Sequence, residues 1–300
     1  MHLNGGSLFR ELLSGSEPVR PDTSDMTSLS TTVISADRRE RLRQFFQDIW
    51  DYRELFYTFF QRDLKVRYKQ TALGSVWVIL QPVTTTAAYV LIFGKIARMP
   101  TEGLPLVLFY FAANVPWSAF SREVTGCALS VESNAELISK VYFPRIVVPG
   151  AIICGSLVDF FIGWFILNLV AAWMGCWHWQ LVALTPLLLL IQWCTALGVG
   201  LALAALNAQY RDVKNVISFL VQIMMLATPV IYPVSRLPAS VQPYLFLNPM
   251  AAVVTTYRDC LKGGPFNWFF LGLALMMAVL YLSGGLWVFR KQESRLADIL

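Results

Sequence analysis

The stretch LVALTPLLLLIQWCTALGVGLALAAL, residues 181–206, contains no Asp, Glu, Lys or Arg. A helix needs about 20 apolar residues to cross the hydrocarbon core of a bilayer, so this stretch alone can span a membrane. The whole chain is 56% hydrophobic and 14% charged, with a mean hydropathy of +0.54. Soluble domains carry about 25% charged residues. The composition therefore excludes an ordinary soluble domain and predicts an integral membrane protein.

Five further apolar runs complete a predicted set of six transmembrane helices. The segments Val241–Leu247 and Ala251–Leu261, between the last two spans, are too short to cross. We expect them to form short re-entrant or interfacial helices. The predicted fold class is an all-α polytopic membrane protein. Its spans are Leu73–Ile96, Leu104–Leu129, Ile146–Met174, Leu181–Leu206, Asn215–Tyr232 and Phe266–Phe289.

The Lys and Arg residues concentrate on one side of the predicted spans. Cytoplasmic loops of membrane proteins carry an excess of these residues, so both termini are expected in the cytoplasm. The residues on this side are Arg62, Lys65, Arg67, Lys69, Lys140, Arg145, Arg211, Lys214, Arg290, Lys291 and Arg295.

The sequence divides into three regions. Residues 1–36 are rich in Ser, Thr, Pro and Gly, which predicts a disordered N-terminal extension. Residues 37–71 combine charge with apolar residues at helical spacing, which predicts a cytoplasmic amphipathic interface helix. A soluble core helix is the alternative for this segment. Residues 72–300 form the six-helix transmembrane domain. The apolar positions of the interface helix are Phe45, Ile49, Tyr52, Phe56 and Phe59.

No sequence motif for a nucleotide or catalytic site occurs in the chain. The phosphate-binding pattern G-x-x-x-x-G-K-[ST] is absent, as are G-x-S-x-G and H-E-x-x-H. The five cysteines form no C-x-x-C pair, and the two histidines lie far apart, so no metal site is predicted. We therefore expect a permease that is not an enzyme, holds no cofactor and takes its energy from elsewhere.

Two predicted spans carry semi-polar stripes. The stripe of span five steps by three and four residues and shares one helix face, whereas the stripe of span one steps by four, so only neighbouring members are expected to face one pore. Such residues can line a conduit for a hydroxylated polymer, or they can bond helices to each other. The first stripe is Trp77, Gln81, Thr85, Tyr89 and Phe93, and the second is Asn215, Ser218, Gln222, Met225, Pro229 and Tyr232.

Ionisable residues inside membrane spans carry a high free-energy cost of desolvation and are usually paired. Arg122 and Glu123 lie in the second span and Asp159 in the third. Opposite charge on adjacent spans predicts an Arg122–Asp159 contact, with a structural role favoured over cargo binding. On span four, small residues from Ala196 to Ala204 predict close helix approach.

Five sequence blocks occur in the order of one known family. They resemble the membrane subunit of type-2 ABC exporters of lipid-linked polysaccharides such as O-antigen and teichoic acid. The resemblance runs from about Phe45 to Arg290. The blocks are RDLKVRYKQTALGSVWVILQP (Arg62–Pro82), NAELISKVYFPRIVVP (Asn134–Pro149), NAQYRDV (Asn207–Val213), TPVIYPV (Thr228–Val234) and LNP (Leu247–Pro249).

The resemblance implies a homodimer that binds two copies of a separate cytoplasmic ABC ATPase, which would hold ATP and Mg. It implies no nucleic-acid partner. Three segments would couple this chain to the ATPase; simple anchoring to lipid headgroups is the alternative for Lys65–Lys69. The coupling residues are Arg62, Asp63, Lys65, Arg67, Tyr68, Glu136, Leu137, Lys140, Phe143, Pro144, Arg145, Asn207, Tyr210, Arg211 and Asp212.

The resemblance also implies the cargo, an undecaprenyl-pyrophosphate-linked polysaccharide that is exported across the inner membrane. The expected cargo path comprises Trp77, Gln81, Thr85, Tyr89, Ser218, Gln222, Met225 and Tyr232, and the segment ending near Tyr257 and Arg258 would shape its outer mouth. Alternatives are a type-2 permease for capsule, teichoic acid, a small drug or a lipid, a polytopic enzyme acting on lipid-linked sugars, and a structural scaffold.

Overall fold

The computed structural model describes residues 52–69, 76–140, 143–210 and 212–299. All of them fall in one compact unit, residues 46–300. Every regular element among these residues is a helix, in agreement with the all-α prediction. The predicted extension 1–36 and residues 37–51 of the interface helix lie outside the described residues.

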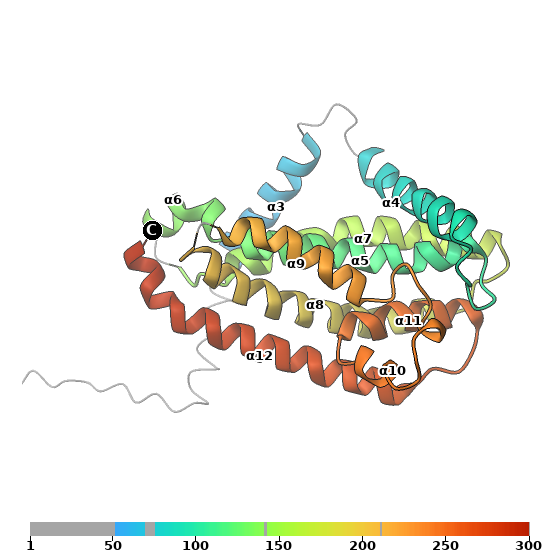
Figure 1. Ribbon diagram of the computed structural model, residues 1–300. Coiled ribbons are helices and arrows are strands. Elements are labelled where there is room, and N and C mark those ends of the chain that lie inside the picture. The colour runs from blue at the N-terminus through green and yellow to red at the C-terminus, as the bar shows by residue number, and fades with distance from the viewer. Residues whose placement is uncertain (1–51, 70–75, 141–142, 211, 300) are drawn as a thin grey trace, which may run out of the picture. The chain divides into compact units, whose positions relative to one another are not determined.

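Four long helices run alongside one another and form the centre of the unit (Figure 1). Helix α5 packs between α7 and α8, and α8 also packs along α12. Nearly every residue of α5 from Leu108 to Val124 is buried, because neighbouring helices surround it. The bounds are α5 Leu106–Leu129, α7 Val147–Trp173, α8 Gln180–Asn207 and α12 Trp268–Ile299.

Helices α4 and α9 each expose an apolar face. Helix α4, Val76–Tyr89, continues as the π-helix η2, Val90–Ile96, and Thr86 is the one buried residue of these two described helices. Helix α9, Val213–Ala227, exposes Phe219 and Leu226 by more than half. These apolar faces need lipid or another protein surface to cover them.

Short helices gather at the two ends of the long ones (Figure 1). One end carries the helices α3 Arg53–Lys69, η3 Glu132–Asn134 and α6 Ala135–Lys140. The other end carries η4 Val234–Arg236, α10 Gln242–Leu245 and α11 Pro249–Lys262.

Local sequence sets the bounds of α11. Asn248 caps its first turn by accepting a hydrogen bond from the Met250 backbone N–H at 3.1 Å, and Pro249 occupies the first helical position. Gly263 ends it with φ of 64°, the left-handed conformation that glycine adopts without strain.

The structure refines the predicted spans. Four helices are long and apolar enough to cross a membrane: Val76–Ile96, Val147–Trp173, Gln180–Asn207 and Trp268–Gln292. Helix α5 has sufficient length but includes charged residues, and α9 is apolar but has 15 residues.

The prediction that span five extends to Tyr232 is wrong. Helix α9 stops at Ala227, and Thr228 is extended, with φ of −104° and ψ of 138°. A residue that precedes proline is driven from the helical region, and Pro229 follows directly. Tyr232 and Pro229 therefore do not continue the α9 stripe.

The small residues of α8 lie at close helix contacts, as predicted. A side-chain carbon built on Gly198 would lie 2.3 Å from the Tyr281 backbone of α12, and one on Gly200 would lie 2.3 Å from Cys127 Cβ of α5. Glycine at these two positions permits the approach of both neighbours.

Candidate functional site

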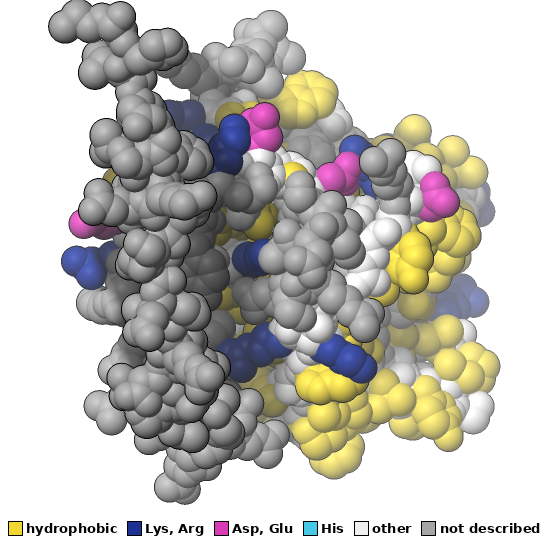
Figure 2. All heavy atoms as spheres, turned by 90° about the vertical axis from the view of Figure 1, so that its left-hand side faces the viewer, with side chains coloured by type: hydrophobic (Ala, Val, Ile, Leu, Met, Phe, Trp, Pro, Cys, Tyr) yellow, Lys and Arg dark blue, Asp and Glu magenta, His cyan; other side chains and the backbone are white. Residues whose placement is uncertain are grey.

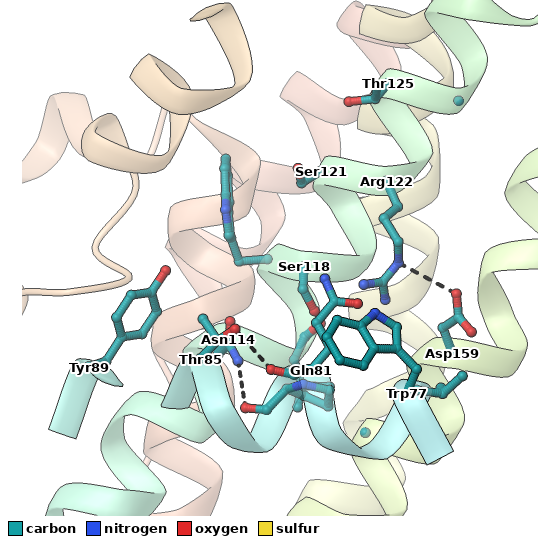
Figure 3. Close-up of a pocket in the computed structure, with 16 residues that line it drawn as sticks. Trp77, Gln81, Thr85, Tyr89, Asn114, Ser118, Ser121, Arg122, Thr125 and Asp159 are labelled. Atoms are coloured by element: carbon teal, nitrogen blue, oxygen red, sulfur yellow. Dashed lines mark hydrogen bonds and ion pairs between the residues drawn. The ribbon is translucent and has the colours of Figure 1, made fainter. Parts of the chain in front are cut away.

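A cavity of about 600 Å³ lies among α4, α5 and α7 (Figure 3). Its wall combines aromatic rings with amide, hydroxyl and charged side chains. It opens beside the poorly covered helix α4. The polar and aromatic members of the lining are Trp77, Gln81, Thr85, Tyr89, Asn114, Trp117, Ser118, Ser121, Arg122, Thr125 and Asp159.

All four predicted cargo-path residues of α4 line this cavity. Trp77 is 50% exposed, and Gln81 is also exposed. These four are neighbouring members of the stripe, and its fifth member, Phe93, is not among the residues that line the cavity. The Thr85 hydroxyl donates to the carbonyl of Gln81 at 2.9 Å, the local bond considered as an alternative role.

The ion pair expected between Arg122 and Asp159 is present. Arg122 Nε on α5 lies 3.5 Å from Asp159 Oδ2 on α7, and both side chains point into the cavity (Figure 3). The Arg122 side chain is 29% exposed and that of Asp159 is 11% exposed. The pair therefore joins two helices and also contributes polar atoms to the wall.

Asn114 fixes α4 to α5, a role that the sequence did not reveal. Its buried amide donates to the Pro82 carbonyl and to the Thr86 hydroxyl, both at 3.1 Å. These two hydrogen bonds hold α4 against α5 and so position the cavity wall.

Glu123 lies next to Arg122 in sequence but does not line the cavity. Its carboxylate accepts a hydrogen bond from the Ser156 hydroxyl at 2.8 Å and from the Gln192 amide at 3.1 Å. Because Ser156 is on α7 and Gln192 is on α8, the carboxylate ties three helices together.

Unlike the α4 stripe, the predicted α9 stripe does not line the cavity. Ser218 and Gln222 are exposed, and neither lines the cavity. Met225 connects the two stripes, because the Tyr89 hydroxyl lies 3.6 Å from Met225 Sδ. Tyr232 is bonded through its hydroxyl to the Leu226 carbonyl at 3.1 Å.

At the α3 and α6 end, the predicted coupling segments converge on η3. The Arg62 guanidinium donates to Asn134 Oδ1 and lies over the Phe59 ring, 5.0 Å from its centroid. Phe59 in turn packs against Phe143, with ring centroids 6.0 Å apart. Arg62 thus connects α3 to the segment that follows α5.

The same short helix reaches the turn between α8 and α9. Glu132 Oε2 accepts a hydrogen bond from the Asn207 amide at 3.0 Å, and Glu132 Oε1 lies 3.7 Å from Lys214 Nζ. Neither Glu132 nor Asn134 was among the predicted coupling residues, although Asn134 opens one of the sequence blocks. Together they join the three predicted segments.

The remaining predicted coupling residues are distributed over this end of the unit. Lys65, Glu136, Lys140, Tyr210 and Asp212 are exposed, and Figure 2 shows Lys, Arg, Asp and Glu side chains on this face. Phe143 is buried. Asp63 faces α7 at Gly155, whereas Leu137, Pro144 and Arg145 are partly buried. The side chains of Arg67, Tyr68 and Arg211 lie outside the described residues.

At the opposite end, Tyr257 and Arg258 of α11 are buried. The Arg258 guanidinium donates to the carbonyls of Pro229 at 2.6 Å, Val230 at 2.8 Å and Phe109 at 3.2 Å. It also lies 3.6 Å from the centroid of the Phe109 ring. The carbonyls of Pro229 and Val230 lie just beyond the end of α9, and their hydrogen bonds thus hold the Arg258 side chain in the protein interior.

A solvent-exposed salt bridge lies at the same end of the unit and joins α11 to the loop before α5. Lys262 Nζ lies 2.9 Å from Glu102 Oε2, and the Ser235 N–H lies 3.3 Å from Glu102 Oε1. Partial burial raises the pKa of Glu102, but the hydrogen bonds from Lys262 and Ser235 outweigh it and leave this pKa below its ordinary value. The carboxylate is therefore charged at neutral pH and links the loop before α5 to α11.

Comparison with known proteins places these features in a family. The model of the ABC-2 type transporter family matches residues 54–261. The chain is 32% identical over 214 residues to the O-antigen export system permease protein RfbA of Myxococcus xanthus, covering 71% of this chain and 82% of the relative. It is 26% identical to a Klebsiella pneumoniae protein of that name, covering 80% and 92%. It is 24% identical to the Escherichia coli polysialic acid transport protein KpsM, covering 78% and 92%.

These matches and the four apolar helices identify a multi-pass protein of the inner membrane. The matched region contains α3, the cavity, η3 and α11, which are the features described above. The chain belongs to the ABC-2 type transporter family of membrane proteins.

Proposed function

We propose that this chain is the transmembrane subunit of an ATP-driven exporter that moves an undecaprenyl-pyrophosphate-linked polysaccharide, similar to O-antigen, across the inner membrane. The observation that carries the proposal is the cavity beside α4, with its exposed indole, amides and hydroxyls. Sugar hydroxyls bond to amides and hydroxyls, and the C–H faces of sugar rings stack on aromatic rings. The names of the relatives point to the same class of cargo.

Six spans are proposed, namely α4 with η2, α5, α7, α8, α9 and α12, with α10 and α11 as re-entrant or interfacial helices. Both termini would lie in the cytoplasm. The Lys and Arg bias supports this orientation. The grouping of α3, α6 and the end of α12 at one end of the unit supports it as well (Figure 1).

Two copies of the chain would form the transport path. The exposed faces of α4 and α9 are the surfaces best suited to a second copy. Large apolar side chains on these faces lack cover in the single chain, and the semi-polar stripes run along the same two helices. In such a homodimer the cavity of each subunit would border a shared path. The stripe residue Met225 already contacts Tyr89 of the cavity wall.

Two copies of a separate ABC ATPase would supply the energy and would hold ATP and Mg. This chain would be non-hydrolytic. The docking surface would be formed by α3, α6 and the α8–α9 turn, since these elements expose charged side chains and converge on η3. Movement of α6 would pass through Asn134 to α3 and through Glu132 to the start of α9. Arg and Lys residues at this end would attract the pyrophosphate of the cargo.

A strain that lacks this chain tests the proposal. Surface polysaccharide should be absent from the strain and restored by the wild-type gene. The double substitution Trp77→Ala and Gln81→Ala should reduce export about tenfold, since one stacking contact and one hydrogen bond are lost. The ATPase should still co-purify with this variant.

The matched control is Trp173→Ala, which removes an indole that is 84% exposed and lies outside the cavity. It should export normally. Unchanged surface polysaccharide in the deletion strain would contradict the proposed function.

A second prediction concerns coupling. Glu132→Ala removes the acceptor for the buried Asn207 amide and should lower the free energy of unfolding by about 1 kcal/mol. The melting temperature should fall by only a few degrees. Export per ATP hydrolysed should fall severalfold, because η3 no longer connects to the α8–α9 turn. Parallel assays of ATP hydrolysis and export in proteoliposomes measure this ratio.

Lys214→Met is the control for this coupling prediction. It removes only the ion pair at 3.7 Å between exposed side chains, which contributes little to stability. If both variants keep the wild-type ratio, Glu132 has no role in coupling.

A further inference from the structure

The charges on the described residues that line the cavity cancel. Among the described lining residues, Arg122 and Asp159 are the charged ones, they have opposite signs, and they lie 3.5 Å apart. The α4 side of the wall is uncharged from Trp77 to Tyr89. The exposed polar residues of α9, Ser218 and Gln222, are also uncharged.

Lys95 and Lys214 are not among the residues that line this cavity. Lys95 lines a separate cavity of about 330 Å³, most of whose wall is apolar. Lys214 lies beside Glu132 at the end of the unit that carries α6. The described wall of the larger cavity therefore has no excess of positive charge.

An excess of positive charge is what a path for a polyanion requires, because surfaces that bind a charged partner carry a complementary potential. Asp159 adds a specific obstacle. A sugar carboxylate that approached the guanidinium of Arg122 would also approach the carboxylate of Asp159, and like charges in a partly buried site repel strongly.

On the basis of the proposed function, we infer that the exported polymer has an uncharged repeat unit and that the Arg122–Asp159 pair is a sugar-binding site that excludes anionic sugars. The guanidinium donates hydrogen bonds to sugar oxygens, and the carboxylate accepts them from sugar hydroxyls. Trp77 lines the same cavity and offers a ring face for stacking (Figure 3). An uncharged polyol satisfies both members of the pair, whereas an acidic sugar satisfies only Arg122.

This inference separates the chain from one of its own relatives in cargo class. The Escherichia coli relative is named for polysialic acid, a polymer with one carboxylate on each sugar. The cavity described here would select against such a polymer.

The first test is the composition of the native polymer. Surface polysaccharide that is present with the gene and absent without it should contain no uronic acid, sialic acid or phosphate in its repeat unit. An acidic group in every repeat would overturn the inference and leave the proposed function intact. Absence of any gene-dependent polysaccharide would instead refute the proposed function.

The second test measures binding to the purified complex of this chain with its ATPase, with maltohexaose and a sialic acid hexamer as probes. Wild type should bind the neutral hexamer at least tenfold more tightly. Asp159→Asn removes a negative charge from the wall and should raise affinity for the sialic acid hexamer at least tenfold. Gln81→Lys adds a cation at an exposed position without altering the ion pair and should act in the same direction.

The matched control is Glu123→Gln, which removes a carboxylate one residue from Arg122 at a position outside the cavity lining. It should leave the preference of the wild type unchanged. Equal wild-type affinity for the two hexamers, or an unchanged preference in both Asp159→Asn and Gln81→Lys, would overturn the assignment of the pair.

Discussion

Gly285→Ala is expected to disrupt the contact between α8 and α12, whereas Gly284→Ala is expected to leave the protein unchanged. A side-chain carbon on Gly285 would lie 2.0 Å from the carbonyl oxygen of Gly198, and one on Gly284 would meet nothing within 4 Å. The two substitutions are chemically identical and adjacent in one helix, so they differ only in the neighbour that the new methyl group meets.

The expected loss for Gly285→Ala is large because the obstructing atoms are backbone. A flexible side chain can turn away from an added methyl group, but the Gly198 carbonyl can move only with α8. Overpacking typically costs about 1–3 kcal/mol, and the rigid backbone obstacle places this substitution at the upper end of that range. Thermal unfolding of the purified protein in lipid nanodiscs measures the loss. Equal melting temperatures for Gly285→Ala and Gly284→Ala would show that α8 and α12 move apart to accommodate the methyl group without a loss of stability.

Arg258→Met is the second substitution with a large expected effect. Methionine retains an unbranched apolar stem but cannot donate to the carbonyls of Pro229, Val230 and Phe109. Each carbonyl group left buried without a donor costs about 1–3 kcal/mol, so the loss of several such bonds at once destabilises the fold strongly. The chain between α9 and α10 should then become accessible to protease, and the melting temperature should fall.

Arg236→Met provides the comparison, because Arg236 is an exposed arginine of the same end of the unit. It should retain wild-type protease resistance. If segment 228–234 of Arg258→Met resists protease as well as it does in wild type, contacts other than those of Arg258 hold this segment in place.

The sequence predicted the helical elements well, because hydropathy and charge are local properties. Runs without charge became long helices, and the small residues of α8 became close contacts. The end of α9 was missed, although Pro229 marks it, because the apolar pattern continues past the break. Rules for residues that precede proline carry more weight there than hydropathy does.

The candidate site was predictable only where two helices carried complementary chemistry. Arg122 and Asp159 have opposite charges on adjacent spans, which was enough to predict their pairing. The hydrogen bonds of Asn114, Glu132 and Arg258 are made to partners distant in sequence. The sequence around a single polar residue does not indicate which distant carbonyl or amide it will contact. The bonds from Asn114 to α4 and from Arg258 to residues 229–230 became visible only in three dimensions.

The most direct test of the proposed path is photo-crosslinking to the cargo in living cells. A photoreactive amino acid at Gln81 of α4 should capture material that reacts with antibody against the surface polysaccharide. The same amino acid at Phe165, an exposed residue of α7 outside the cavity lining, should capture none. Capture at position 81 alone is the predicted result. Failure to capture polysaccharide at position 81 while export continues, or equal capture at position 165, would contradict the claim that the cavity lies on the cargo path.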